Sequence, residues 1–158
     1  MDFEQQEQSP QLRISADGVW YYGDTPLERL GLVRLFYTVL KHEAGEYRIV
    51  TPVESVPVVV EDAPYSVVAV RDSEEGNNKE SNNGGIECIL NDENLLPLTN
   101  TCFPRIGANN ALYIRTPNGF EARFTRAAFV QLSAYIQEKQ NGEFSISSFG
   151  QTFPITLS

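Results

Sequence analysis

The sequence predicts an α+β fold made of two small, similar domains, each an antiparallel sheet packed on one main helix. A hairpin with a glycine turn, followed by a threonine and a helical apolar pattern, occurs twice: Gly18 precedes Thr25, and Gly119 precedes Thr125. The two copies lie about 100 residues apart, which indicates an internal repeat. Between them, residues 73–85 contain no apolar side chain and cannot contribute to a core.

The domain boundaries follow from this pattern. Residues 1–10 are expected to be a disordered tail, residues 11–72 the N-terminal domain, residues 73–85 a mobile linker and residues 86–158 the C-terminal domain. The length of 158 residues is compatible with two small domains or one larger one, and in either case it allows a sizeable buried core.

The first hairpin is expected to have a three-residue turn. With Gly18 in the left-handed conformation, Ile14 pairs with Trp20 and Leu12 with Tyr22, which puts these apolar side chains on one face. A two-residue Asp-Gly turn would instead mix apolar and polar side chains on each face. The longer turn is therefore the predicted one.

The central element of the first domain is expected to be a helix over residues 25–41. Thr25 and Glu28 have the spacing of a capping box, and Pro26 suits the first helical position. Apolar side chains cover well over half of the projected circumference, whereas a surface helix needs only an apolar stripe. We therefore expect this helix to be covered on more than one side.

The sequence also predicts the surroundings of two side chains of this segment, Arg34 and His42. Arg34 is the long cation in the narrow polar strip of the helix, so we expect it to be partly buried and to pair with Glu54, with Asp62 or with a ligand. His42 is expected in the last helical turn, where the helix dipole favours a cation.

The remaining elements follow from apolar alternation and from turn residues. A second three-residue turn is expected to pair Arg115 with Glu121, and Thr125 to cap a helix that runs to about Lys139. Residues 99–110 are expected to be mostly loop. Strands are expected at residues 47–51, 55–61 and 65–71 of the first domain and at 86–90, 95–98 and 153–157 of the second.

The charge of the chain argues against one class of partner. Lys and Arg number 12 against 21 Asp and Glu, which gives a net charge of −9 at pH 7. Such acidity argues against binding of a nucleic acid polymer, which depends on neutralising phosphates. Most of the cations are arginines, which suit fixed pairing with a carboxylate or a phosphate.

The chain is expected to be cytoplasmic. It contains no run of about 20 apolar residues, so no membrane span is expected. The acidic N-terminal stretch also lacks the hydrophobic region of a secretory signal.

No catalytic centre, metal site or cofactor is expected. Cys88 and Cys102 are the only cysteines and His42 is the only histidine, whereas a zinc site needs more ligands at closer spacing. Two such thiols are typically buried free cysteines. No pair of carboxylates is placed by helical spacing inside an apolar stretch, so general acid–base catalysis has no visible site.

Short strings along the chain resemble the proteobacterial family of unknown function DUF1285. In the first half they are Asp17-Gly18 with Trp20-Tyr21, followed by residues 32–36, 51–54 and 60–65. In the second half they are Leu90-Asn91, residues 113–126 and residues 148–154. Together these strings extend from residue 12 to residue 154.

The resemblance implies a duplicated α+β core whose second half is pleckstrin-homology-like. It also implies a ligand cleft between the halves for a nucleotide-like molecule, and a role in signalling. Trp20, Glu54 and Asp62 also have purely structural readings, as a core residue, an ion-pair partner and a turn residue. The ligand-binding candidates that the resemblance marks are Trp20, Arg34, Thr51, Glu54, Asp62, Tyr65, Asn91, Arg115 and Arg126.

Three functions are weighed on this basis. The leading hypothesis is a non-enzymatic ligand-binding or regulatory module that holds a small anionic, nucleotide-like ligand between its two halves, with arginines as the anion contacts. The alternative is a protein–protein interaction module of pleckstrin-homology-like type, which uses a sheet edge or a helix groove and no small-molecule ligand. An enzyme is the least expected of the three.

Overall fold

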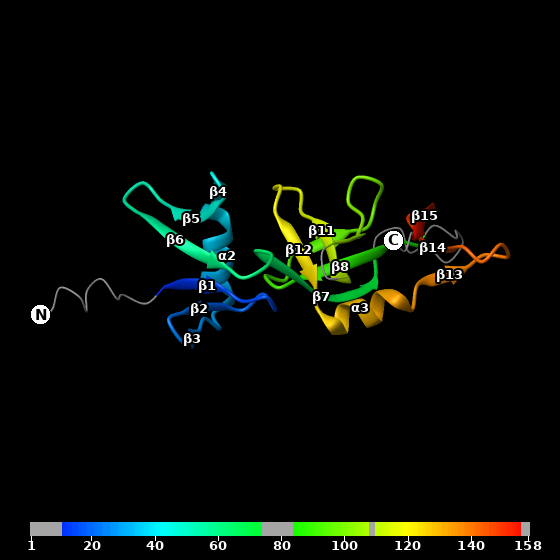
Figure 1. The fold of residues 1–158 in the computed structure, drawn as a ribbon, viewed down its shortest axis with the longest axis horizontal. Coiled ribbons are helices and arrows are strands. Elements are labelled where there is room, and N and C mark those ends of the chain that lie inside the picture. The colour runs from blue at the N-terminus through cyan, green and yellow to red at the C-terminus, as the bar shows by residue number, and fades with distance from the viewer. Residues whose placement is uncertain (1–10, 74–83, 108–109, 156–158) are drawn as a thin grey trace, which may run out of the picture. The chain divides into compact units, whose positions relative to one another are not determined.

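A computed structural model describes residues 11–73, 84–107 and 110–155 (Figure 1). The chain forms two compact units, Met1–Pro64 and Tyr65–Ser158, each with its own six-stranded sheet. The predicted tail and nearly all of the predicted linker lie outside the described residues. The second unit begins earlier than the predicted boundary, because the strand that starts at Tyr65 pairs within the second sheet.

The described residues of the N-terminal unit form a six-stranded sheet and one helix. The strand order is β3-β2-β1-β6-β5-β4, and all neighbours are antiparallel except β1 and β6, which are parallel. The elements are β1 (Leu12–Ile14), β2 (Trp20–Tyr22), β3 (Thr25–Pro26), α2 (Leu30–Val39), β4 (Leu40–Glu43), β5 (Glu46–Val50) and β6 (Ser55–Val60).

The predicted register of the first hairpin is confirmed. Ile14 lies opposite Trp20 and Leu12 lies opposite Tyr22. Gly18 has a φ of 85°, in the left-handed region that glycine adopts without steric cost. Ile14 and Trp20 are fully buried, so this face of the hairpin belongs to the core.

The first helix begins later than predicted. α2 starts after Arg29, which makes no side-chain capping hydrogen bond, whereas Thr25 and Pro26 form β3 and pair with Tyr22 and Tyr21. The capping-box prediction is therefore wrong. Pairing with β2 satisfies the backbone hydrogen-bonding groups of β3. The short capping pattern contributes too little free energy to outweigh that pairing.

The first helix is also less covered than predicted. Val33 and Tyr37 are buried, but Leu35 is 56% exposed and Arg34 is exposed as well. The expectations of a helix covered on more than one side and of a partly buried Arg34 are therefore wrong. The buried side rests on Trp20, whose ring lies 5.2 Å from that of Tyr37 in an edge-on contact.

His42 does not lie in a helix. The helix ends at Val39, and the chain continues directly into β4, where Leu40 pairs with Ile49 and His42 pairs with Tyr47. The two rings of the second pair stack with centroids 4.0 Å apart. The predicted position in the last helical turn is wrong because cross-strand pairing continues through this segment.

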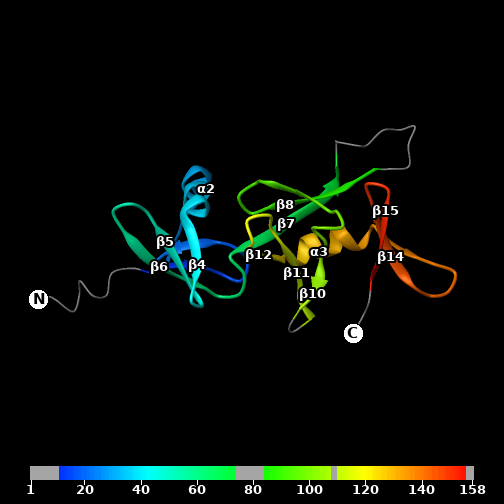
Figure 2. The same ribbon diagram turned by 90° about the horizontal axis from the view of Figure 1, so that it is seen from above.

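The C-terminal unit contains a second six-stranded sheet, one helix and a separate three-stranded sheet (Figure 2). The larger sheet has the order β10-β11-β12-β7-β8-β9, with only β12 and β7 parallel. Its strands are β7 (Tyr65–Asp72), β8 (Ile86–Leu90), β9 (Leu95–Pro97), β10 (Arg105–Ile106), β11 (Leu112–Arg115) and β12 (Glu121–Phe124). After them come α3 (Arg126–Ser133), β13 (Ile136–Glu138), β14 (Phe144–Ser148) and β15 (Gln151–Ile155).

The predicted fold class, α+β with two similar units, is confirmed. Each large sheet consists of two three-stranded antiparallel meanders, and the first strand of one meander pairs in parallel with the last strand of the other. The correspondence between the units differs from the predicted one. The hairpin at Gly18 belongs to a first meander, whereas the hairpin at Gly119 belongs to a second meander. The two helices therefore occupy different places in the repeat.

The predicted second hairpin and the start of the second helix are confirmed. Arg115 lies opposite Glu121, and the Thr125 hydroxyl oxygen accepts a hydrogen bond from the backbone N–H of Ala128 at 3.2 Å. The helix ends at Ser133, however, and not near residue 139. Residues 136–138 pair with β14 instead, so they belong to a sheet and not to the predicted helix.

Because Trp20 is buried and Leu35 is exposed, truncating them is expected to lower the free energy of unfolding by very different amounts. Leu35→Ala is expected to change the free energy of unfolding by less than about 1 kcal/mol, because it removes little buried surface. Trp20→Ala should cost about 3–5 kcal/mol, because it empties the centre of the core. Urea titrations followed by circular dichroism measure both changes, since Trp20 is the only tryptophan. Equal losses in the two variants would contradict this description of the N-terminal unit.

Tyr135 connects the end of α3 to β7. Its hydroxyl donates a hydrogen bond to Asp72 Oδ1 at 2.8 Å. Burial, and after it this hydrogen bond, raises the pKa of Tyr135 to about 12. The folded state therefore holds this proton more tightly than the unfolded chain, in which tyrosine titrates near pH 10. The stability that results is fully present below about pH 10 and is lost as the pH rises through about 12.

The variant Tyr135→Phe tests this linkage. Below pH 9 it is expected to be less stable than the wild type by about 1 kcal/mol, because it lacks the hydrogen bond. Between about pH 10 and 12 the difference should shrink, because only the wild type loses stability through this group. Guanidinium titrations at several pH values measure the difference. A difference that stays constant up to pH 12 would contradict the prediction.

Candidate functional site

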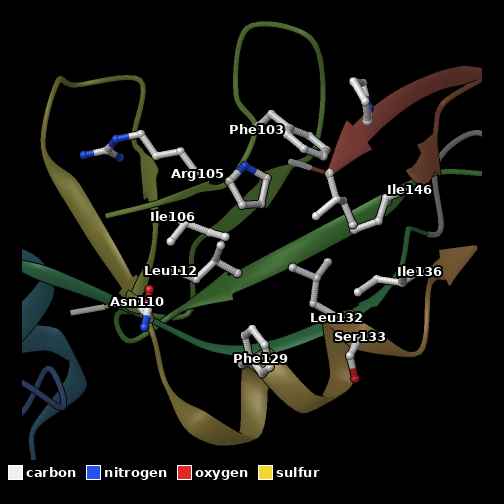
Figure 3. A pocket seen from close by; sticks show the side chains of 13 residues that line it. Phe103, Arg105, Ile106, Asn110, Leu112, Phe129, Leu132, Ser133, Ile136 and Ile146 are labelled. Carbon is white, nitrogen blue, oxygen red and sulfur yellow. The ribbon is translucent and has the colours of Figure 1, made fainter. Parts of the chain in front are cut away.

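An apolar cavity of about 510 Å³ lies within the C-terminal unit (Figure 3). Side chains from β10, β11, α3, β13, β14 and β15 line it, so both sheets of this unit and the helix border the cavity. Leu132 and Ile146 are buried, whereas Phe129, Ile136 and Ile106 are between 37% and 50% exposed. The cavity therefore has a buried apolar floor and a partly exposed apolar rim.

The cap of α3 and the pairing of β13 determine which side chains face the cavity. Thr125 fixes the start of the helix, and one helical turn places Phe129 and Leu132 on the same side of it. The pairing of Ile136 with Ile146 then brings the short sheet against the cavity. Because α3 ends at Ser133, Ile136 lies on a strand and not on a further helical turn.

Few polar side chains line the cavity. Ser133 donates its hydroxyl hydrogen bond to the backbone carbonyl of Val130 at 2.6 Å, so this donor is already used. Asn110 and Arg105 are the other polar lining residues. The guanidinium of Arg105 points away from the cavity, and only its aliphatic stem borders it (Figure 3). The interior therefore suits an apolar group.

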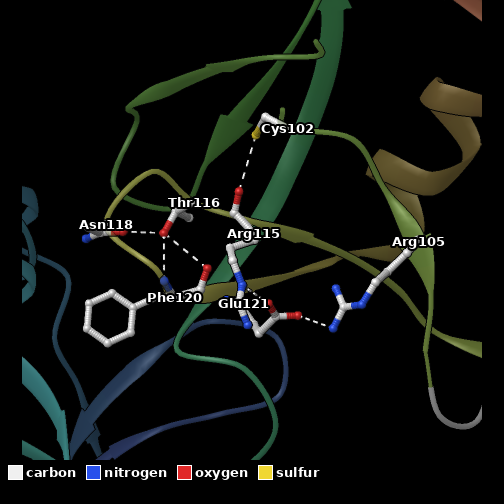
Figure 4. Close-up of polar contacts among 7 residues, drawn as sticks. All are labelled: Cys102, Arg105, Arg115, Thr116, Asn118, Phe120 and Glu121. Atoms are coloured by element: carbon white, nitrogen blue, oxygen red, sulfur yellow. Dashed lines mark hydrogen bonds and ion pairs between the residues drawn. The ribbon is translucent and has the colours of Figure 1, made fainter. Parts of the chain in front are cut away.

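A pair of arginines on β10 and β11 shares one carboxylate of β12 (Figure 4). Arg105 donates from Nη2 to Glu121 Oε1, and Arg115 donates from Nε to Glu121 Oε2 at 3.1 Å. The Arg105 guanidinium also lies over the Tyr113 ring, 5.6 Å from its centroid. The two arginine side chains are 57% and 70% exposed, and that of Glu121 is 24% exposed. We call Arg105, Arg115 and Glu121 the arginine–glutamate cluster.

Strand pairing explains why these groups meet. Arg105 lies opposite Tyr113 across β10 and β11, and Arg115 lies opposite Glu121 across β11 and β12. Side chains alternate between the two faces of a sheet, so the charged row lies on one face. The neighbouring Ile106 lines the cavity from β10. The charged row and the apolar cavity thus share the short edge strand β10.

Two of the marked positions make hydrogen bonds at one end of the second six-stranded sheet. Tyr65 is buried, and its hydroxyl oxygen accepts a hydrogen bond from Asn118 Nδ2 at 3.3 Å. Burial raises the pKa of Tyr65, so the phenol stays protonated at neutral pH. Asn91 Oδ1 accepts a hydrogen bond from the backbone N–H of Ser66 at 3.1 Å and fixes the turn after β8. Both contacts stabilise the end of the sheet.

The marked positions of the N-terminal unit differ in their surroundings. Trp20 is 1% exposed and fills the core. The Thr51 hydroxyl oxygen accepts hydrogen bonds from the backbone N–H groups of Val53, at 3.3 Å, and of Glu54, at 3.1 Å, which stabilises a turn. Arg34, Glu54 and Asp62 are exposed.

In the C-terminal unit, Arg115 is the marked position that joins a cluster of charges. Arg126 is exposed at the first residue of α3. The sequence reasoning anticipated the pairing of Arg115 with Glu121, but it assigned Arg105 to a loop. A strand of two residues is too short to show a periodic pattern. The polar Arg105 next to the apolar Ile106 is the one feature of the sequence that is typical of a strand there.

Burial affects both cysteine thiols in the same way. Cys88 is fully buried, and burial raises the pKa of its thiol. Cys102 donates a hydrogen bond from Sγ to the carbonyl oxygen of Arg115 at 3.2 Å, and burial raises its pKa as well. Within the described residues, no three side chains of His, Cys, Asp or Glu are grouped so that they could hold a metal ion.

Comparison with known proteins identifies relatives of both units. Residues 4–63 match the family described as domain of unknown function (DUF1285), N-terminal domain. A DUF1285 family protein from Silicibacter pomeroyi DSS-3, whose crystal structure is known, is similar with a TM-score of 0.72 and 29% identity, over 94% of this chain and 80% of that protein. The resemblance to DUF1285 predicted from the sequence is thereby confirmed.

A second solved structure shares the fold. It is a DUF1285 family protein from Shewanella baltica OS155, with a TM-score of 0.58 and 23% identity, over 79% of this chain and 91% of that protein. No curated protein matches the chain. In the part of the chain that the structure covers, neither helix has the length and apolar character needed to span a membrane.

Proposed function

We propose, for a chain whose residues 4–63 match the DUF1285 N-terminal domain, that the second unit binds a small amphipathic anion in a non-enzymatic, regulatory role. The apolar part of the ligand would occupy the cavity, and its anionic group would lie at Arg105 and Arg115. The observation that carries this proposal is the position of Arg105 on the edge strand β10: its stem borders the apolar cavity, and its guanidinium, which points away from the cavity, pairs with Glu121.

The lining of the cavity supports an amphiphile over a nucleotide. A nucleotide presents a polar base and sugar, which lose hydrogen bonds to water unless the site replaces them. Of the polar lining groups, the Ser133 hydroxyl already donates to a backbone carbonyl. An alkyl or aromatic group loses nothing in such surroundings and gains the free energy of burial. The anionic character expected from the sequence is kept, at the arginines.

The state of the titratable groups supports binding over catalysis. The phenol of Tyr65 and the thiols of Cys88 and Cys102 all have pKa values raised by burial. Groups with raised pKa values are poor bases and poor nucleophiles at neutral pH, because their reactive form is the anion.

A protein-interaction module is the second candidate. β10 is an edge strand of two exposed residues, Arg105 and Ile106, so its outer backbone edge can accept a strand from a partner. A strand added there would also lie beside the cavity rim. The two functions differ in what stabilises the protein: the first requires a small amphiphile, and the second a polypeptide.

A thermal-shift titration with decanoate tests the first function. Decanoate, kept below its micelle concentration, is expected to raise the melting temperature by about 5–10 °C at a hundredfold excess over Kd. Acetate at the same concentration should have no effect, because it has the anionic group without the apolar chain. AMP should raise the melting temperature less than decanoate. An equal response to decanoate and acetate would contradict the proposal.

Two variants with matched controls locate the ligand. Ile136→Trp, at the cavity rim, should abolish the response to decanoate, whereas Val130→Trp should not, because Val130 is exposed on α3 but does not line the cavity. Arg105→Met should weaken decanoate binding about tenfold, by the loss of one charge-assisted contact. The control Arg126→Met should leave it unchanged. Equal effects in variant and control would place the ligand elsewhere.

A further inference from the structure

We infer that the arginine–glutamate cluster is a phosphate-type anion site that the protein's own Glu121 closes, and that this side chain sets the choice of anionic group. The inference deepens the proposed function and rests on it for the apolar part of the ligand. In the unliganded protein, the Glu121 carboxylate occupies the place between two guanidinium groups. A ligand phosphate would take that place and displace it.

The geometry of the cluster is that of a bound anion. Both oxygens of Glu121 accept hydrogen bonds, one from each arginine, so a single planar anion bridges Arg105 and Arg115. The ring of Tyr113 beneath Arg105 holds that guanidinium in place by a cation–π contact. The arginines are thus positioned for an oxyanion before any ligand binds, which reduces the ordering cost of binding.

The exposure of the three side chains allows the exchange. The two arginine side chains are 57% and 70% exposed, so their outer N–H groups can be reached from solvent, and the Glu121 side chain is 24% exposed. Figure 4 shows the Glu121 carboxylate between the two guanidinium groups. Glu121 lies on β12, and its backbone stays paired with that of Arg115 when the side chain rotates away. Displacement therefore requires a side-chain rotation and no change of the sheet.

The charge balance favours phosphate over carboxylate. Two guanidinium groups against one carboxylate leave a surplus of one positive charge, in a chain whose net charge is −9. A phosphate monoester carries about −1.5 to −2 at pH 7 and offers three acceptor oxygens. It can therefore neutralise both arginines and bind each of them, whereas a ligand carboxylate only repeats what Glu121 already provides.

A similar ion pair in the N-terminal unit supplies the control. Arg13 donates to Glu61 and lies over the Tyr21 ring, 4.4 Å from its centroid. The described contacts of Glu61 are this one arginine and the backbone N–H of Ala16, at 3.2 Å. That pair has one arginine for one carboxylate, so it has no surplus charge and we expect no anion site there.

The experiment titrates inorganic phosphate, at constant ionic strength in chloride and at pH 7.5, into the full chain. Binding is followed by the NMR signals of the arginine Cζ carbons, assigned by Arg105→Met and Arg115→Met. Glu121→Gln is expected to bind phosphate at least tenfold more tightly than the wild type, with shifts confined to Arg105 and Arg115. Glu61→Gln should bind no more tightly than the wild type.

The outcomes separate this inference from the proposed function. If Glu121→Gln and the wild type bind phosphate equally, or if neither shifts the two arginine signals, the inference is overturned whatever decanoate does. If phosphate behaves as expected while decyl phosphate binds no more tightly than inorganic phosphate, the anion site stands and the proposed cavity ligand fails. Decyl phosphate binding more tightly than both decanoate and inorganic phosphate supports the two together.

The double variant Glu121→Gln with Arg126→Met excludes a trivial effect of the lost negative charge. It has the same net charge as the wild type but keeps both arginines of the cluster, so a merely electrostatic gain would disappear in it. A built site with two arginines would keep the tenfold gain. Loss of the gain in the double variant would overturn the inference.

Discussion

The parallel pairing of β7 with β12 is the constraint on which the C-terminal unit depends. Ala122 lies opposite Tyr65 and Phe124 opposite Val67, and the backbone N–H of Thr125 continues the pairing to the Val67 carbonyl at 3.0 Å. This last hydrogen bond places the helix cap at the end of the parallel pair. α3 then lies along β7, where Gln131 accepts a hydrogen bond from the backbone N–H of Val70 at 2.7 Å.

The candidate site follows from the same constraint. Because β12 is held in the middle of the sheet, the meander that precedes it extends outward through β11 to β10 at the edge. The charged row of this meander lies on one face of the sheet and the apolar row on the other. The helix that follows β12 encloses the apolar side, and the cavity lies where β10, α3 and the short sheet meet. Neither the cavity nor the charged row belongs to one segment of the chain.

Sequence reasoning succeeded where a local pattern and the tertiary structure agree. Both hairpin registers were predictable, because their alternating side chains and left-handed glycines specify one pairing. The Thr125 cap was predictable for a similar reason. The same logic failed at Thr25, where an equally good local pattern lies on a strand. Propensity and capping are worth about 1 kcal/mol each, so sheet pairing decides between such alternatives. The Arg115–Glu121 half of the site was predictable, whereas Arg105 and the cavity depend on contacts between distant segments.

The parallel pairing also means that, during synthesis, β7 begins the second sheet long before its parallel neighbour β12 is made. The sheet of the first unit is complete once the chain has reached β6, but β7 lacks its parallel neighbour until β12 has left the ribosome. β7 contains several valines and is buried over much of its length in the folded protein. Contacts between distant segments form slowly, because the loop between them must first be closed. During that interval β7 has an unprotected apolar edge, so the second unit is the part of the nascent chain most exposed to aggregation and to chaperone binding.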